Sequence, residues 1–242
     1  MKFALIIPCY NEASRLSIES YENFIVSNPN FTLFFVDDGS TDQTLSILKR
    51  FSAQYVGRVI VLSLEKNSGK AEAVRRGIGE ALSHTSYDYL GYWDADLTTP
   101  LSEICRFEKF IQEESPWVVL GSRVRRAGAQ VERIWYRHIL GRLFATVVKV
   151  TTGLLIYDTQ CSSKFFKQDI AKTIFNEKFI SNYLFYVELF LRLKREFGEA
   201  IFLEKTHELS LTRWKDISAS KVKPIDFLKA PIELYKILKD YR

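Results

Sequence analysis

Two carboxylates stand one residue apart in Asp94-Ala95-Asp96, directly after the apolar run Tyr87–Trp93. Side chains two residues apart on an extended strand point to the same face, so both carboxylates could act on one ligand. Hard cations such as Mg²⁺ and Mn²⁺ use one or two carboxylates together with phosphate oxygens of a substrate. An isolated Asp-x-Asp is more often a turn or a solvated pair, but its position after a buried strand favours metal–diphosphate chemistry.

A second acidic segment, Asp37-Asp38-Gly39-Ser40, follows the apolar run Phe31–Val36. A carboxylate at the end of a buried strand can accept hydrogen bonds from ribose hydroxyls or from a base N–H. The alternative is a turn that leads into a helix, because Ser40 and Gln43 have the spacing of a capping box. The segment alone leaves both interpretations open.

Lys70 follows Gly69 at the expected start of a third helix. A helix N-terminus and a lysine together suit a phosphate group. The segment is not a P-loop, because Leu64 replaces the first glycine of that motif and Ala71 replaces its serine or threonine. A solvated lysine beside a helix cap is the alternative interpretation.

Alternating strands and helices would position these residues. Apolar runs predict five buried strands: Phe3–Cys9, Phe31–Val36, Val59–Leu64, Tyr87–Trp93 and Trp117–Leu120. Helices are expected over Ala13–Ser27, after Ser40, from Gly69 through Leu82, and after Thr99 as N-cap with Pro100 in the first helical position. This order predicts an α/β protein with a mostly parallel sheet flanked by helices, which binds ligands at the carboxyl ends of its strands.

Composition limits the class of protein. The chain has 242 residues, of which 47% are hydrophobic and 26% charged, which excludes bulk disorder and predicts a single domain over residues 1–242. The net charge of +5 suits a protein that handles anions, but acidic residues at the expected crevice argue against a nucleic-acid partner. The cysteines Cys9, Cys105 and Cys161 are widely spaced, which argues against a disulfide framework and favours a reducing compartment.

The second half of the chain contains two amphipathic segments, Ile134–Val150 and Phe227–Tyr241. An apolar face beside a cationic face is typical of helices that lie on a membrane surface, and the alternative is that both segments pack on the core. Residues 124–133 are predicted to form a basic loop, and a further helix is expected near Tyr183–Phe197. No stretch reaches 18 apolar residues, so no membrane-spanning helix is expected.

Five segments, taken together and in this order, resemble the motifs of family 2 glycosyltransferases, which have the GT-A fold. They are Ile7-Pro8-Cys9-Tyr10-Asn11-Glu12, Val36-Asp37-Asp38-Gly39-Ser40-Thr41-Asp42, Asn67-Ser68-Gly69-Lys70, Asp94-Ala95-Asp96 and Gly121-Ser122-Arg123. Each follows or ends an expected strand, and the resemblance extends over essentially the whole chain.

The second half resembles one branch of that family more closely. The segment from Asp158 to Phe166 is similar to the Asp-Thr-Gln-Cys-Gly-Phe-Lys motif of dolichyl-phosphate β-glucosyltransferases, except that Ser162 and Ser163 replace the Gly-Phe pair. Phe185-Tyr186-Val187-Glu188-Leu189 and Trp214-Lys215-Asp216, followed by Ser220-Lys221, resemble their downstream motifs. Dolichyl-phosphate mannose synthases share much of this pattern, and many relatives carry a transmembrane segment that this sequence lacks.

The resemblance implies roles for the matching residues. The base, ribose and diphosphate of a nucleotide-sugar donor would be held by Pro8, Tyr10, Asn11, Glu12, Val36, Asp38, Lys70, Asp94 and Ala95. Asp94 and Asp96 would be the metal ligands, with Asp96 the better one. Donor and acceptor phosphates would meet Arg123, Arg133, Arg137, Arg213, Lys221 and Gln160. The catalytic set would comprise Asp96, Arg123, Arg213 and Lys221 together with Asp158 and Glu188, which would line the sugar side with Gln160.

The implied reaction is an inverting transfer of a hexose, with Mg²⁺ or Mn²⁺, to a polyprenyl or dolichyl phosphate. UDP-glucose is the favoured donor and GDP-mannose the alternative. The acceptor oxygen needs no strong base, because the second pKa of a phosphate monoester is about 6. Cations must instead hold two repelling anions together. A soluble saccharide or protein acceptor would need a carboxylate base, for which Glu188 or Asp158 would serve.

A non-catalytic nucleotide-sugar binder is less favoured, because Asp94, Asp96, Arg123 and Lys221 are all present. The expected organisation is a nucleotide-sugar-binding half over residues 1–123 and an acceptor-binding half over residues 124–242. The expected location is cytoplasmic, peripheral on the cytosolic face of a membrane.

Overall fold

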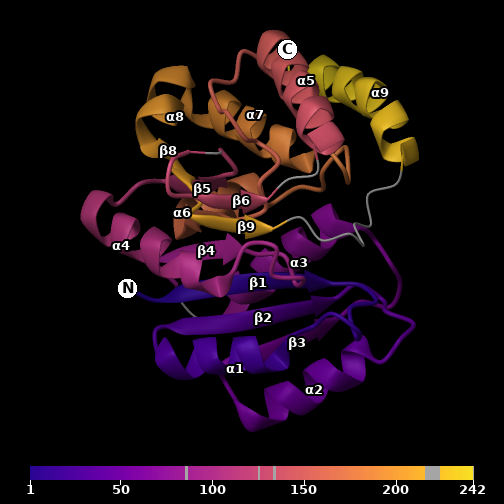
Figure 1. Cartoon of the computed structure of the whole chain (residues 1–242), viewed down its shortest axis with the longest axis vertical. Coiled ribbons are helices and arrows are strands. Elements are labelled where there is room, and N and C mark those ends of the chain that lie inside the picture. The colour runs from indigo at the N-terminus through magenta and orange to yellow at the C-terminus, as the bar shows by residue number, and fades with distance from the viewer. Residues whose placement is uncertain (85–86, 125, 133–134, 216–223, 242) are drawn as a thin grey trace.

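A seven-stranded sheet runs through the molecule. The computed structural model describes residues 1–84, 87–124, 126–132, 135–215 and 224–241 (Figure 1). The strand order is β3-β2-β1-β4-β7-β5-β8. The strands span Val59–Ser63 (β3), Phe31–Asp37 (β2), Phe3–Cys9 (β1), Tyr89–Tyr92 (β4), Lys164–Lys167 (β7), Val118–Ser122 (β5) and Thr206–Ser210 (β8). Only β7 runs antiparallel to its neighbours β4 and β5, so the predicted mostly parallel sheet is confirmed.

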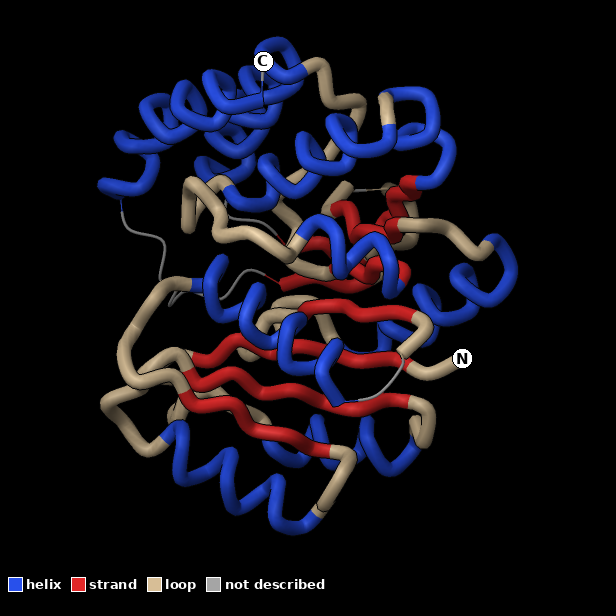
Figure 2. Tube along the Cα trace, turned by 180° about the vertical axis from the view of Figure 1, so that it is seen from behind, coloured by secondary structure: helices blue, strands red, loops and turns tan. Residues whose placement is uncertain are grey.

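Helices cover both faces of the sheet (Figure 2). Strand residues alternate between the faces, so that Phe3, Leu5 and Ile7 belong to one apolar cluster and Ala4 and Ile6 to the other. The first cluster includes residues of α1 (Ile18–Ser27), α2 (Thr44–Gln54) and α4 (Ile104–Glu114). The second includes residues of α3 (Lys70–His84), α5 (Trp135–Thr152), α6 (Gln168–Ile174), α7 (Phe185–Phe197), α8 (Glu199–Lys205) and α9 (Pro224–Tyr241). Because both faces of the sheet are buried, the strands appear in the sequence as continuous apolar runs.

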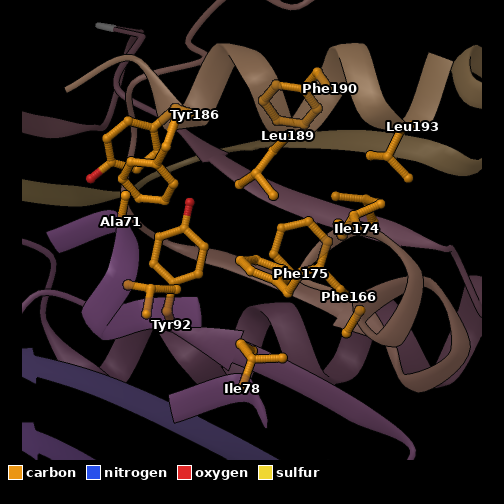
Figure 3. Close-up of a cluster of buried hydrophobic side chains, with 14 of the residues drawn as sticks. Ala71, Ile78, Tyr92, Phe166, Ile174, Phe175, Tyr186, Leu189, Phe190 and Leu193 are labelled. Atoms are coloured by element: carbon orange, nitrogen blue, oxygen red, sulfur yellow. The ribbon is translucent and has the colours of Figure 1, made fainter. Parts of the chain in front are cut away.

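The second cluster brings α7 against the middle of the sheet. Tyr92 of β4 stacks on Phe166 of β7 at 6.2 Å between ring centroids, and it lies 6.2 Å from the ring of Tyr186 on α7 (Figure 3). Leu189 and Phe190 of the same helix are also fully buried. Because Tyr186 is in the first turn of α7, this packing brings the start of that helix close to the end of β4.

A second, two-stranded sheet corrects one prediction. Residues 124–133 were expected to form a loop, but Gln130–Glu132 form β6, which pairs in parallel with β9 (Arg213–Lys215). Gln130 pairs with Arg213, which lies 83 positions further along the chain, so no local sequence pattern could reveal this pairing. It places Trp214 next to the end of β5, where Arg123 stands.

Two predicted helix caps are wrong. The helix after Ser40 begins at Thr44, whose N–H donates to Asp42, and the Ser40 hydroxyl instead accepts from the N–H of Asn11. The predicted N-cap Thr99 is followed by Pro100 and by the 3₁₀ turn η1 (Leu101–Glu103), and within the described part of the chain its buried hydroxyl has no hydrogen-bond partner. The first helix begins at Ile18 rather than Ala13.

The helices expected near Tyr183–Phe197 and Phe227–Tyr241 are present as α7 and α9. The segment expected over Ile134–Val150 corresponds to α5 from Trp135 onward, and Ile134 lies outside the described residues. In the part of the chain that the structure describes, no helix has the length and apolar character needed to cross a membrane.

Candidate active site

The carboxyl ends of β1, β2, β4 and β5 meet at one edge of the sheet. The N–H of Asp38, after β2, donates to the carbonyl of Cys9 at the end of β1 at 2.8 Å. The Tyr21 hydroxyl donates to the carbonyl of Ala95, after β4, at 3.3 Å. The acidic segments predicted from the sequence therefore border the same edge, as expected for a parallel sheet.

Lys70 and Asp94 form an ion pair at this edge. The Lys70 ammonium, on the first residue of α3, donates to Asp94 and is also hydrogen-bonded to the Tyr186 hydroxyl. Burial disfavours the charged ammonium, but the Asp94 carboxylate outweighs it, and the pKa of Lys70 is raised. Burial also disfavours the charged Asp94, but Lys70 and a hydrogen bond from Ser162 leave the pKa of that carboxyl lowered. Asp94 is thus ionised, and the positive charge of Lys70 already compensates its negative charge.

Asp96 differs from Asp94 because no described cation compensates its charge through an ion pair. One of its oxygens accepts from the N–H of Thr98 at 3.2 Å, and no described lysine or arginine forms an ion pair with it. Burial, followed by the negative charge of Asp94, raises the pKa of Asp96. A cation beside Asp96 would relieve this repulsion.

These two carboxylates fit a divalent metal whose other ligands come from a substrate. The described residues contain no group of three or more His, Cys, Asp or Glu side chains that could hold a metal by themselves. Mg²⁺ sites commonly use one or two carboxylates plus substrate phosphates. The uncompensated Asp96, with Asp94 beside it, matches that donor set.

Arg123 and Asp158 form a second ion pair. The Arg123 guanidinium donates through Nε and Nη2 to the two carboxylate oxygens of Asp158, each at 2.7 Å, and the Arg123 backbone N–H donates to the same carboxylate at 3.0 Å. The guanidinium carbon lies 5.4 Å from the ring centroid of Trp214. Burial opposes the charge of Arg123, but Asp158 outweighs it, and the pKa of Arg123 is raised.

Arg123 keeps donors for a ligand. A guanidinium has five N–H donors. Two of them bind Asp158, so three have no protein acceptor among the described residues. In this arrangement Asp158 orients Arg123 and is poorly placed to act as a general base.

The loop at residues 66–70 is built around Asp38. Both oxygens of Asp38 accept backbone N–H groups, from Ser68 at 2.8 Å and from Gly69 at 2.9 Å. Burial raises the pKa of Asp38, although these hydrogen bonds oppose the shift. Gly39 is required beside it, because its φ is +66° and a Cβ there would meet the backbone of Lys66 at 2.6 Å.

The other predicted donor residues lie on or just after β1 and β2. Pro8 pairs with Val36 in register inside the sheet, and Tyr10 is half-buried at the end of β1. The Asn11 side-chain oxygen accepts from the N–H of Thr41 at 2.8 Å. The carboxylate of Glu12 accepts two hydrogen bonds from Arg15, at 2.8 and 2.9 Å.

Glu188 is not placed with these groups. Its carboxylate is 1% exposed and accepts from Arg192 and Tyr241 and from the N–H of Ile180. The hypothesis that Glu188 lines the sugar side or acts as a base therefore has no support in its contacts.

The remaining predicted residues are placed as follows. The side chain of Arg213 is exposed on β9, and its N–H donates to Glu103 at 3.1 Å. The side-chain nitrogen of Gln160 is buried without a hydrogen-bond partner among the described residues. Arg133 and Lys221 lie outside the described residues, and Arg137 lies in α5 with a side chain outside the description.

Sequence reasoning missed four residues at this edge. Tyr186 contacts Lys70, Ser162 contacts Asp94, Trp214 contacts Arg123, and Lys164 is buried beneath them. All four lie in the segments that resemble dolichyl-phosphate β-glucosyltransferase motifs, but the resemblance assigned them no role in the site. Tertiary packing brings them to this edge.

The sheet topology, the paired acidic residues and the oriented arginine are together those expected from the sequence for a glycosyltransferase of the GT-A fold. The chain belongs to glycosyl transferase family 2, whose family model matches residues 4–175. It is 29% identical over 252 residues to a dolichyl-phosphate beta-glucosyltransferase of Trichomonas vaginalis, covering 99% of this chain and 73% of the relative. It is also 29% identical to the human dolichyl-phosphate beta-glucosyltransferase, covering 92% of this chain and 70% of the relative.

Solved structures support the same fold. The glucosyl-3-phosphoglycerate synthase of Mycobacterium tuberculosis, in complex with Mn²⁺, UDP-glucose and phosphoglyceric acid, superposes with a TM-score of 0.67. That match covers 98% of this chain and 80% of the solved chain at 18% identity. The predicted GT-A fold and the predicted glycosyltransferase class are confirmed.

Proposed function

We propose that this glycosyltransferase moves glucose from UDP-glucose to a dolichyl or related polyprenyl phosphate, with Mg²⁺ or Mn²⁺, at a membrane surface. The names of the full-length relatives support this acceptor and this sugar. The observation that carries the proposal is Arg123, which is oriented by Asp158, has three N–H donors without an acceptor among the described residues, and is near enough to Asp94 to help lower the pKa of that carboxyl. That arrangement suits two phosphate-bearing substrates.

The chemistry needs no general base. The acceptor phosphate oxygen attacks the anomeric carbon of the sugar, the bond from that carbon to the diphosphate oxygen breaks, and UDP leaves. The attacking oxygen is already anionic, because a phosphate monoester has a second pKa of about 6. Asp158 and Glu188 are both paired with arginines, which weighs against an acceptor hydroxyl that must be deprotonated.

The residues of this chain would bring two anions together. Arg123 would bind the acceptor phosphate through its remaining donors, and Gln160 would offer its unpartnered amide N–H₂. Lys70 would meet the donor diphosphate at the N-terminus of α3 while it holds Asp94. Asp96 and Asp94 would hold the divalent ion, which when bound neutralises charge on the leaving diphosphate. In this proposal residues 1–122 would serve the donor, and Arg123, at the boundary of the two expected halves, would serve the acceptor together with Gln160.

A lipid acceptor requires a surface that meets a membrane, and α5 and α9 offer one. The two helices contact each other at one end of the molecule (Figure 1). Their inner faces are in the core through Val148, Leu234 and Ile237. Their outer faces expose apolar side chains, with Val150 79%, Ile232 60% and Tyr235 68% exposed.

The charge on these helices suits an anionic bilayer. Exposed lysines flank the apolar residues: Lys149 on α5 and Lys229, Lys236 and Lys239 on α9. A lysine near an anionic membrane surface contributes about 1 kcal/mol to binding. The inner faces of α5 and α9 pack on the core, and their outer faces are the ones that we propose meet the membrane.

The proposal is tested by turnover. Purified protein with Mg²⁺ or Mn²⁺ would be incubated with UDP-glucose, GDP-mannose and other nucleotide-sugars, with and without a short polyprenyl phosphate. We expect UDP release from UDP-glucose only when the lipid phosphate is present. Transfer to soluble saccharides without lipid dependence, or binding of the donor without any turnover, would contradict the proposal.

The metal assignment is tested by Asp96→Ala with Asp240→Ala as the control, since Asp240 is exposed on α9. Because a metal supplies several kcal/mol of charge stabilisation, turnover should fall by about 100-fold or more in Asp96→Ala only. Equal turnover in both variants would contradict the assignment.

The membrane surface is tested by sedimentation with vesicles of anionic lipid. Ile232→Glu should lower the bound fraction, whereas Val56→Glu should not, because Val56 is 85% exposed in the α2–β3 connection. Equal binding by the two variants would contradict docking through α9.

A further inference from the structure

Lys164 is the first residue of β7 and is fully buried. It lies in the sheet between Tyr92 of β4 and Leu120 of β5. Its ammonium donates to the carbonyl of Thr159 at 3.1 Å and to the carbonyl of Cys161. The ammonium also lies 4.6 Å from the ring centroid of Tyr186. A buried ammonium carries a large desolvation cost unless its contacts offset it, so a fold that retains one depends on those contacts.

The two carbonyls belong to the turn that connects Asp158 to β7. Lys164 binds this turn from inside, while the N–H of Gly121 in β5 binds the carbonyl of Ser163 at 2.8 Å. The turn is closed on itself by the N–H of Cys161, which donates to the carbonyl of Asp158 at 3.4 Å. Its backbone is therefore fixed from both sides.

Both ends of this turn reach the site. Asp158, at its start, holds the Arg123 guanidinium with two hydrogen bonds. Ser162, near its end, is hydrogen-bonded to Asp94. Between them, Gln160 carries the unpartnered side-chain nitrogen. One short segment thus touches the arginine on the acceptor side and the carboxylate on the donor side.

We infer that Lys164 is a positioning residue: by holding the carbonyls of Thr159 and Cys161, its side-chain nitrogen fixes the 158–163 turn so that Asp158 orients Arg123 and Ser162 orients Asp94. The inference rests on the proposed function only for the identity of the two ligands, the nucleotide-sugar donor and the phosphate acceptor. The contacts of the 158–163 turn do not depend on that function. Burial lowers the pKa of Lys164 to about 7, because it outweighs the opposing charges of Cys161 and Asp158. The side-chain nitrogen has at least two N–H donors in either protonation state, enough for both carbonyls.

Arg192 offers a matched control. It is also a buried cation, 4% exposed, and it donates to the carbonyls of Ile174, Glu177 and Lys178 in the α6–α7 connection. The segment that it holds carries none of the residues assigned to the ligands above. Lys164→Met and Arg192→Met therefore each remove a buried basic side chain that holds backbone carbonyls, one beneath the site and one away from it. Arg192→Met also removes the partner of Glu188, so it should lose at least as much stability as Lys164→Met.

The experiment measures thermal unfolding and steady-state kinetics with UDP-glucose and polyprenyl phosphate, below the unfolding transition of every variant. Both variants should unfold at lower temperature than the parent protein. Misplacing reacting groups by about 1 Å can cost about 100-fold in rate, so we expect kcat to fall about 30-fold or more in Lys164→Met. In Arg192→Met it should change by less than about threefold. Equal kcat in the two variants would overturn the inference.

A double-mutant cycle separates positioning from general loosening. Asp158→Asn should lower kcat by about 100-fold in the parent protein but by less than about threefold in Lys164→Met, because the turn is already released. An equal effect of Asp158→Asn in both backgrounds would overturn the inference.

If Lys164→Met does not fold, Ser162→Ala replaces it in the cycle. Alone it should lower kcat about tenfold, the value of one hydrogen bond to a charged group. Combined with Asp158→Asn, the loss should not exceed that of Asp158→Asn by more than about threefold. Multiplicative losses would show that the turn is not one unit and would overturn the inference.

Calorimetric binding of UDP with Mn²⁺ needs no acceptor and no turnover. Lys164→Met should weaken UDP binding about tenfold through the displaced Asp94, whereas Arg192→Met should not. A parent protein that binds UDP but does not transfer glucose would refute the proposed function while this comparison still decides the role of Lys164. Unchanged UDP affinity in a folded Lys164→Met would overturn that role.

Discussion

Two arginine–carboxylate pairs in this molecule have the same chemistry and different surroundings. Arg123–Asp158 lies at the sheet edge, with the two side chains 19% and 10% exposed. Arg192–Glu188 lies within α7, with the two side chains 5% and 1% exposed. Arg192 uses all five of its N–H donors, on Glu188, Tyr241 and three carbonyls. Arg123 uses two of five within the described structure.

The difference shows that charge alone does not identify a binding site in this fold. A buried pair whose donors and acceptors are all satisfied stabilises the packing of α7 against α9 and the α6–α7 connection. A pair with donors left over, at the edge where ligands bind, can take an anion. Unused N–H donors on the arginine partner therefore separate the Asp158 pair from the Glu188 pair, although sequence motifs had placed both carboxylates on the sugar side.

The largest difference is expected from changing each carboxylate to its amide. Asp158→Asn removes the charge that orients Arg123, so kcat/KM should fall about 100-fold. Stability should change less, because the amide oxygen still accepts one of the two hydrogen bonds and the site is partly solvated. Steady-state kinetics with UDP-glucose and polyprenyl phosphate, together with a thermal melt, measure both quantities. An activity within about threefold of the parent protein would contradict the role given to Asp158.

Glu188→Gln is the matched change in the other pair. It leaves the buried Arg192 charge uncompensated, so the free energy of unfolding should fall by about 2 kcal/mol, somewhat less than complete removal of a buried partner. Kinetics of the folded protein should be unchanged. Chemical denaturation gives the stability and the same assay gives the activity. A loss of turnover without a loss of stability would return Glu188 to the reaction as a base.

Much of the fold could be predicted from the sequence, because its signals are local. The runs Phe3–Cys9 and Phe31–Val36 are apolar at every position or nearly so, and the sheet buries both faces of the strands they form. Asp94, Asp96 and Arg123 follow such runs directly. Knowing where a parallel strand ends was therefore enough to place them at the ligand-binding edge.

The rest depended on contacts between distant residues. Ser40 has the spacing of a helix cap, but its hydroxyl bonds Asn11, 29 positions away, once β1 and β2 are paired. Glu188 was assigned by its motif, and its partner Tyr241 lies 53 positions further along on α9. Lys164 looks like an ordinary strand residue until β7 enters the sheet between β4 and β5. No local pattern encodes these pairings.

The smallest expected effect is a pH dependence of the free energy of unfolding. It should come from Lys164, beneath the Arg123–Asp158 pair, and not from the Arg192–Glu188 region. Burial lowers the pKa of Lys164 to about 7, from the 10.5 that is usual for a lysine. Between these values the unfolded chain holds a proton that the folded chain has released, so stability rises with pH. The rise should be about 1 kcal/mol between pH 7 and pH 8.

The groups that face Lys164 set the range of the measurement. Arg123 and Lys70 have raised pKa values and keep their charge throughout it, whereas the raised pKa values of Cys161, Tyr92 and Tyr186 lower stability only as pH approaches 9 or exceeds it. Urea unfolding at pH 7.0, 7.5 and 8.0 should therefore show the rise in the parent protein and in Glu188→Gln. The rise should be absent in Lys164→Met. A slope that persists in Lys164→Met, or disappears in Glu188→Gln, would assign the titration to another group and remove this distinction between the two regions.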